Sequence, residues 1–354
     1  MKKKLLLGTT ALVAAGLVTA GTAGTAQAED PISASVNGYY RAAMAMISQD
    51  DQDGEVADAN QSIALGQDTE ISINGSTTLN NGITAGFNVQ IEGNAAQTAG
   101  VTVDEKHIFF RGSFGQIRVG AVESVQQAMT VFAPNGNYNF GVNSAFFLFG
   151  NGGSLVNVRT FTDGLGNEDS LKLVYFSPTM GGFRFGASFA PDDGEAGQYG
   201  GNSGNTAGEL QNHRSVSGEF STAVGPANIR AMVGYEGYTL QRCNASAATQ
   251  TCEDNPETTK VGGTISFGEW SIGGGYQESE QVTDRAAGGG REREDADLGI
   301  AYWSGNMGFG LQWGQAEIGS TDGSNDSLDI YEANATYVVG PGIDIGAGVS
   351  KGEF

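Results

Sequence analysis

The chain has 354 residues, of which 56 are glycine, 40 are acidic and only 18 are Lys or Arg, so its formal net charge is −22. This acidity argues against nucleic-acid binding, because a basic face is needed to neutralise phosphates. Glycine is not periodic and proline is scarce, which excludes collagen. Two cysteines and two histidines leave almost nothing for a zinc or iron–sulfur site.

The first residues have the pattern of a secretory signal peptide. A basic start at residues 2–4 precedes an uncharged stretch from Leu5 to Ala20, and Ala26-Gln27-Ala28 is a small-x-small cleavage site. A membrane anchor is the alternative, but the stretch is short and rich in Thr, Gly and Ala. We expect residues 1–28 to be removed and residues 29–354 to form one exported domain.

The exported chain contains no apolar run long enough for a membrane-spanning helix, which leaves a soluble protein or a β-barrel. Apolar and polar residues alternate from Glu70 to Thr78 and again from Ile83 to Glu92, on either side of an Asn-Asn-Gly turn. Each segment has the length of about ten residues that a tilted strand needs to cross a bilayer. The same alternation recurs to the end of the chain.

Short and long connections alternate between these segments, as they do in outer-membrane barrels. The long, polar connections are predicted at residues 48–68, 93–103, 123–168, 191–213, 238–258, 279–294 and 316–326. Aromatic residues near the segment ends fit an interfacial girdle: Tyr235, Tyr276, Tyr302, Trp303, Trp313 and Tyr337. The pattern therefore predicts an all-β fold, a transmembrane antiparallel β-barrel.

About fifteen strands are visible, whereas a closed bacterial barrel has an even number. The terminal Phe354 is in phase with the polar face of the last segment, although a closing strand should end with an aromatic residue on its lipid face. We expect about 16 strands, with the closing strand beyond Phe354 or one strand merged or missed among the fifteen.

Two segments carry a resemblance to a known family. Phe110–Gly120 (FRGSFGQIRVG) looks like a turn between two porin strands, and Leu171–Pro178 (LKLVYFSP) with Gly182–Ser188 (GFRFGAS) looks like the hairpin after a constriction loop. In this order, and with the signal peptide, the chain resembles the trimeric general-diffusion porins of alphaproteobacteria, the Rhodobacter type. The resemblance implies sixteen strands, a homotrimer and a third long loop folded into the lumen.

The segment 123–169 matches that constriction loop in position. It is too apolar for an exposed tip, with Phe132, Phe140 and Phe146 among its aromatic residues, and an apolar loop of this length needs a packing partner. We expect it to fold inside the barrel. The alternatives are a cap on the rim or a contact with a neighbouring subunit.

Charges on the lumen phase are the candidate pore-lining residues. The basic ones lie on neighbouring strands, namely Arg41, Arg111, Arg118, Lys172, Arg184 and Arg230. The acidic ones lie in the inward loop, namely Glu123, Asp163, Glu168 and Asp169. Opposed charges across a narrow pore create a transverse field that orients polar solutes. For each arginine, the alternative is an ordinary ion pair with Glu70, Glu92 or Glu105.

Acidic loops predict a weak cation preference, because they raise the local cation concentration at the pore mouth. Asp51, Asp53 and Glu55 resemble part of a calcium loop but lack the full twelve-residue ligand set, so calcium binding and a solvated acidic loop both remain open. Cys243 and Cys252 flank one long loop, where a disulfide is expected in an exported protein and free thiols are the alternative.

These features predict a passive, water-filled channel for small hydrophilic solutes and ions in the bacterial outer membrane. A substrate-specific channel is the alternative, and it would need an aromatic track along the lumen. An outer-membrane enzyme is a third hypothesis, but neither His107 nor His213 has an accompanying nucleophile motif. Small residues in the first strand, Ala34, Gly38, Ala42 and Ala43, suit packing between subunits of a homotrimer.

Overall fold

The structure is a computed structural model that describes residues 31–48, 62–93, 102–137, 141–143, 158, 160, 169–192, 210–240, 255–280, 292–319 and 325–353. Fifteen strands and one short helix lie within these residues. They are β1 (Ser33–Met46), β2 (Ile63–Thr78), β3 (Thr84–Glu92), β4 (Thr102–Gly112), β5 (Gly115–Ala121), α2 (Val125–Ala128), β6 (Leu171–Phe176), β7 (Phe183–Asp192), β8 (Leu210–Val224), β9 (Ala227–Leu240), β10 (Glu257–Phe267), β11 (Trp270–Glu280), β12 (Arg293–Ser304), β13 (Met307–Gly319), β14 (Asn325–Gly340) and β15 (Ile343–Glu353).

All fifteen strands form one sheet, in which each strand pairs antiparallel with its neighbours in the sequence. Tight turns join the strands at one rim. In the turn after β2, Gly82 has a φ of +81° and the Asn81 side chain accepts a hydrogen bond from the Ile83 N–H at 3.1 Å. The predicted antiparallel all-β fold is therefore confirmed.

Several strands extend further into the predicted long connections than the alternation indicated. Asp68 and His213 were assigned to connections by the sequence pattern, but they lie in β2 and β8. In β2, Gln67 and Thr69 interrupt the apolar phase between the exposed Leu65 and Ile71, and in β8 polar residues precede the exposed Val216, although both strands continue. Polar residues at strand ends were therefore misread as loop.

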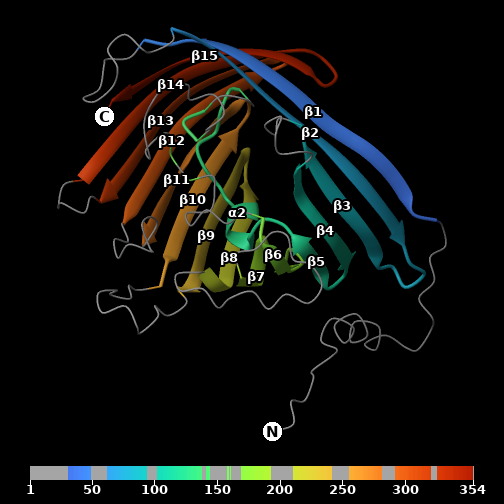
Figure 1. The fold of residues 1–354 in the computed structure, drawn as a ribbon. Coiled ribbons are helices and arrows are strands. Elements are labelled where there is room, and N and C mark those ends of the chain that lie inside the picture. The colour runs from blue at the N-terminus through green and yellow to red at the C-terminus, as the bar shows by residue number, and fades with distance from the viewer. Residues whose placement is uncertain are drawn as a thin grey trace, which may run out of the picture.

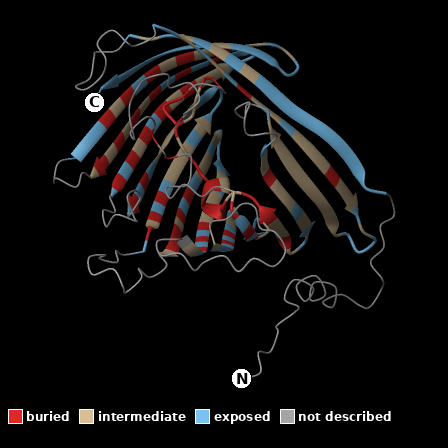
Figure 2. Ribbon diagram, viewed as in Figure 1, coloured by how far each residue is buried: buried red, intermediate tan, exposed pale blue. Residues whose placement is uncertain are grey.

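The sheet is apolar on its convex side and polar on its concave side. Leu311 is 59% exposed while the neighbouring Gln312 is 6% exposed, and Phe189 and Ser188 show the same contrast. Figure 2 shows this alternation as stripes along the strands. Soluble proteins bury most large apolar side chains. A sheet that exposes them in a continuous band is suited to lipid contact.

The buried core lies inside the curve of the sheet. Figure 1 shows α2 and the segment that follows it running through the interior, between β5 and the β12–β14 wall. Two apolar clusters form there. One contains Val122, Val125, Met129, Val174 and Phe176; the other contains Val142, Val158, Ala316, Ile318, Leu328 and Ile330.

Strands β1 and β15 are the two ends of the sheet order. Fourteen antiparallel steps separate them, so they run in the same direction. Their residues line one shared cavity of about 940 Å³, which includes Tyr40, Met44, Ile345 and Val349. No pairing joins the two strands within the described residues.

Within the part of the chain that the structure describes, no helix is both long and apolar enough to cross a membrane.

The turn before β5 requires glycine for two reasons. Gly115 has a φ of +103°, and a Cβ there would lie 2.1 Å from the Phe176 carbonyl oxygen. Gly181 has a φ of +59° in another turn at the same rim, but a Cβ there would meet nothing within 4 Å. A comparison of substitutions at Gly115 and Gly181 therefore distinguishes the cost of backbone strain from the cost of the steric clash.

We therefore expect Gly115→Ala to lower the free energy of unfolding by more than ~2 kcal/mol, because strain and clash add. Gly181→Ala, the matched control, should cost about 1 kcal/mol. Urea unfolding of the folded protein in detergent measures both. Equal losses would show that the contact with Phe176 is unimportant.

Candidate functional site

The inward segment comprises residues 122–170, between β5 and β6, and its described part packs against the inner face of the sheet. It begins with α2, whose N-cap residue Ser124 accepts a hydrogen bond from the Gln127 N–H at 3.3 Å. Val125 and Met129 pack on Val174 and Phe176 of β6. The predicted loop folded into the lumen is confirmed for these residues.

Hydrogen bonds tie the start of the segment to the wall across β8, β9 and β10. The Ser124 hydroxyl donates to Glu236 Oε2 at 3.0 Å. The Gln126 backbone N–H donates to Ser215 Oγ, and its side-chain amide donates to the Thr258 carbonyl. Further along, Trp303 Nε1 donates to the Asn135 carbonyl at 3.1 Å. Trp303 thus faces the lumen, and its predicted place in the outer girdle was wrong.

Glycines on the inner face of the wall leave room for the backbone of the segment. A Cβ at Gly262 would lie 1.8 Å from the Val131 carbonyl oxygen, and one at Gly299 would lie 2.6 Å from the Pro134 carbonyl oxygen. Neither glycine needs a positive φ, so close approach of the segment explains them. Part of the glycine excess in the composition therefore serves this packing.

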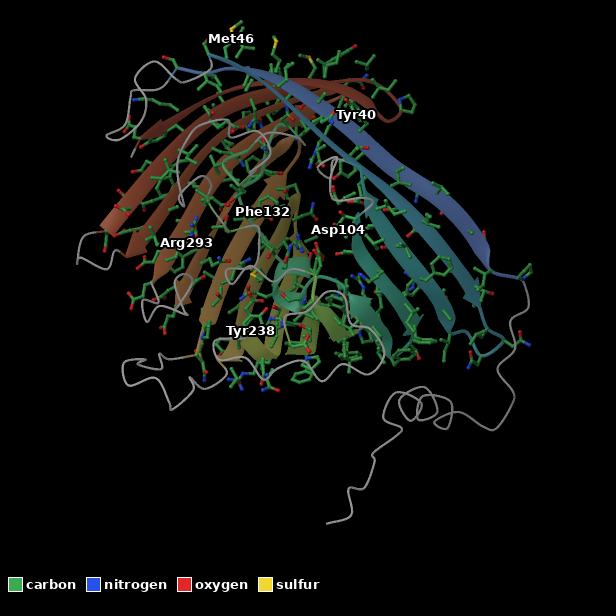
Figure 3. All side chains as sticks on the ribbon, viewed as in Figure 1. Tyr40, Met46, Asp104, Phe132, Tyr238 and Arg293 are labelled. Carbon is green, nitrogen blue, oxygen red and sulfur yellow. The ribbon has the colours of Figure 1, made fainter. Side chains whose placement is uncertain are left out.

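Beside the segment lies a polar cavity of about 600 Å³. Five carboxylates and two guanidiniums line it: Glu70, Asp104, Glu105, Glu123, Asp169, Arg111 and Arg118. Figure 3 shows Asp104 and Phe132 inside the curve of the sheet. The cavity brings Arg111, Arg118, Glu123 and Asp169 together, four of the residues that the sequence singled out.

Three arginines in this region stack on aromatic rings. The guanidinium carbons of Arg118 and Arg184 lie 5.1 and 4.5 Å from the centre of the Phe176 ring, and that of Arg111 lies 6.0 Å from the Phe109 ring. Within the described chain, none of the three forms an ion pair with a carboxylate. Cation–π contact stabilises each charge.

The remaining basic candidates are engaged elsewhere. Arg41 pairs with Asp68, the residue opposite it in the β1–β2 register, and Arg230 makes a two-point contact with Glu219. The alternative of an ordinary lumen ion pair therefore holds for both, with partners other than those expected. The buried Lys172 donates to the Ser170 carbonyl at 3.3 Å.

Several candidates lie outside the described residues: Asp163, Glu168, Asp51, Asp53, Glu55, Cys243 and Cys252. Sequence reasoning missed Phe109 and Phe176 as partners of the arginines. Both are on the lumen phase of their strands, so a search for aromatic residues among polar positions was the available signal.

Two further clusters have a different chemistry. Carboxylate oxygens of Glu70, Glu92 and Asp104 lie within 4.8 Å of one another, a geometry that concentrates cations.

Ser124, His213 and Glu236 also lie together, but all three are fully buried, and Ser124 donates to Glu236 rather than to a histidine base. This second cluster cannot deliver a nucleophile to a substrate.

Comparison with known proteins identifies the family. Residues 8–354 match the Gram-negative porins. The chain belongs to the Gram-negative porin family. It is therefore a channel of the bacterial outer membrane and not an enzyme.

Solved porins share the fold at low sequence identity. The trimer form of OmpT from Vibrio cholerae has a TM-score of 0.60 and 12% identity, over 92% of this chain and 89% of that one. An anion-selective porin from Comamonas acidovorans gives 0.55 and 15%, over 88% and 85%. A mutant of the Rh. blastica porin gives 0.52 and 14%, over 90% and 95%. No curated protein matches the sequence.

Glu123 lies at the start of the inward segment, outside the strands. Burial raises the pKa of its carboxyl above the usual 4.5, and Asp104 adds to this, while Arg118 and Lys172 act in the opposite direction. A raised pKa means that this negative charge is lost at a higher pH than that of an exposed glutamate. Neutralising the residue therefore relieves a desolvation cost at pH 7.

We expect the cation contribution of Glu123 to fall as the pH drops through a midpoint above 4.5. The reversal potential in a salt gradient, measured from pH 8 to pH 4 for the wild type and for Glu123→Gln, isolates this charge as the difference between the two curves. A difference curve that titrates at or below the usual value would contradict the burial of this carboxylate.

Proposed function

We propose that this porin is a passive, water-filled channel for small hydrophilic solutes and ions. The observation that carries the proposal is the polar cavity of about 600 Å³ between the inward segment and the wall, lined by seven charged residues. A charged, hydrated lining favours ions and polar solutes, and the adjacent segment restricts their size.

We infer a weak preference for cations. Five carboxylates face two guanidiniums in the cavity, and the chain as a whole carries a net charge of −22. Such a field raises the local concentration of cations along the path. The anion-selective porin from Comamonas acidovorans has the same fold, so selectivity depends on the lining and not on the barrel.

A substrate-specific channel is the second candidate, and one observation favours it. Phe109, Arg111 and Arg118 line the cavity together, and the Arg111 guanidinium lies over the Phe109 ring. An aromatic ring beside two guanidiniums suits a solute that has both an apolar ring and an anionic group. Block of the current by such a solute distinguishes this candidate from a general pore.

We propose a homotrimer of the Rhodobacter type, exported with removal of residues 1–28. The outward face of β1 combines small residues with the exposed Val36, Tyr40 and Met44, a surface suited to protein contact. The trimer form of the Vibrio cholerae OmpT is a structural precedent. The motif order and the Rh. blastica porin support the narrower type.

The decisive measurement is single-channel conductance of the refolded protein in a planar bilayer, with a KCl gradient. We expect large ohmic steps that group in threes and a reversal potential that favours cations. Small steps blocked by one class of solute would favour the specific channel. A folded, inserted protein that shows no steps would contradict the pore, and single steps together with monomers after cross-linking would contradict the trimer.

We also propose that Asp51, Asp53 and Glu55 bind calcium and that Cys243 and Cys252 form a disulfide in another loop. Carboxylate oxygens are the ligands that calcium prefers, and an exported chain favours the disulfide. Calorimetric titration of the folded protein with CaCl₂ should show a binding heat that Asp51→Asn with Asp53→Asn removes. Equal heats in the two proteins would contradict the calcium site. Maleimide labelling without reductant would contradict the disulfide.

A further inference from the structure

Asp297 lies where the wall and the inward segment meet. It is on β12, its side chain points to the lumen, and it is only 5% exposed. The apolar neighbour Leu298 faces outward and is 55% exposed. An acid at such a buried position costs free energy unless hydrogen-bond donors surround it.

Four donors surround this carboxylate. Oδ1 accepts from the backbone N–H of Ala133 at 3.1 Å and from that of Gly275 at 2.5 Å. Oδ2 accepts from Asn143 Nδ2 at 2.6 Å and lies 2.5 Å from the Thr160 hydroxyl. Hydrogen bonds to an ionised acceptor are about twice as strong as those between neutral groups.

These bonds connect three distant points of the segment to one wall residue. Ala133 follows α2, whereas Asn143 and Thr160 stand on either side of residues 144–157. The Thr160 hydroxyl also lies 2.5 Å from Asn143 Oδ1, and the Val158 N–H donates to the Val142 carbonyl. Asp297 therefore joins Asn143 and Thr160, which lie before and after residues 144–157, to one point of the wall.

Two glycines beside Asp297 leave room on the wall for the inward segment. A Cβ at Gly275 would lie 3.1 Å from the Val131 carbonyl oxygen, and one at Gly299 would lie 3.0 Å from the Ala133 side chain. Gln312 adds directional bonds nearby, since its amide donates to the Ala133 carbonyl and accepts from the Val142 N–H. The carboxylate of Asp297 differs in that its bonds also reach Thr160, on the far side of residues 144–157.

We propose that Asp297 is the positioning residue that fixes the constriction and so sets the width of the pore. The proposal rests on the proposed channel function, because the width matters only if solutes pass. Without the carboxylate, two backbone N–H groups and two side chains lose a shared acceptor. The segment then exchanges between the docked position and displaced ones.

The first test measures the position of the segment without using conduction. Val142→Cys, at a fully buried position, is introduced into a chain that carries Cys243→Ser and Cys252→Ser. A small maleimide reacts with this thiol only when the segment leaves the wall. Adding Asp297→Ala should raise the labelling rate on the order of tenfold or more, because the displaced population grows by that factor.

The matched control is Glu219→Ala. Glu219 is also a lumen acid of the wall, but its side chain bonds to Arg230 and not to the segment. It should leave the labelling rate unchanged. Equal rates for Asp297→Ala and Glu219→Ala would overturn the proposal, whatever the wild-type conductance is.

The second test measures the consequence for the pore. Asp297→Ala channels should show a second, larger conductance level and admit larger neutral sugars in liposome swelling. Asp297→Asn should be intermediate, because its one remaining oxygen can still accept from both backbone N–H groups. Wild-type behaviour of Asp297→Ala in both assays would overturn the proposal. A wild type without conductance would contradict the channel instead.

A third variant keeps the proposal testable if Asp297→Ala does not insert. Thr160→Val preserves the shape of the side chain and removes one donor to the carboxylate. Faster labelling of the thiol introduced by Val142→Cys, together with a second conductance level, would support the role of Asp297. An inserted Thr160→Val protein that matches the wild type in both readouts would overturn it.

Discussion

The constraint on which the structure depends is that backbone polar groups cannot be left unpaired in lipid. Each of the strands from β2 to β14 meets this constraint through two antiparallel neighbours. A sheet that satisfies its backbone in this way can turn an apolar face to the membrane and a polar face to water. The contrast between Leu311 outside and Gln312 inside follows from that arrangement. The polar inner face is then available for function.

A polar inner face creates a second requirement, because the inward segment is too apolar for water and must pack on it. The wall accommodates the segment in two ways. Glycines such as Gly262 and Gly299 remove side chains where the segment backbone passes. Buried polar side chains such as Asp297 and Gln312 supply acceptors and donors for that backbone. The position of the inward segment thus depends on the wall as much as on the segment itself.

The charged side chains of the lumen lie on the polar inner face, beside the inward segment that packs on it. Arginines that face the lumen pair with a nearby carboxylate, as Arg41 does with Asp68 and Arg293 with Asp295, or stack on an aromatic ring, as Arg118 does on Phe176. The paired ones contribute little to the field in the pore, because the opposite charge is adjacent. Stacking on the ring stabilises the charge of the others. The carboxylates that line the cavity outnumber its two guanidiniums.

The sequence by itself determined the antiparallel all-β fold and the apolar and polar faces, and it favoured an inward position for the segment after β5. The fold and the faces depend on a period of two residues and on local composition, which are visible in any short window. Strand ends were less predictable, because polar residues interrupt the apolar phase there while the strand continues. Asp68 and His213 were misplaced for this reason.

Only the tertiary structure decided which lumen side chains meet. Arg41 was predicted to line the pore, with an ion pair to Glu70, Glu92 or Glu105 as the alternative, but strand register places it opposite Asp68. In the sequence, Asp297 is one of many polar residues on the lumen phase. In the structure, it forms hydrogen bonds to residues 133, 143 and 160, which are far away in the sequence. Register and the route of the segment are set by contacts between distant strands. Alternation within a strand contains no information about them.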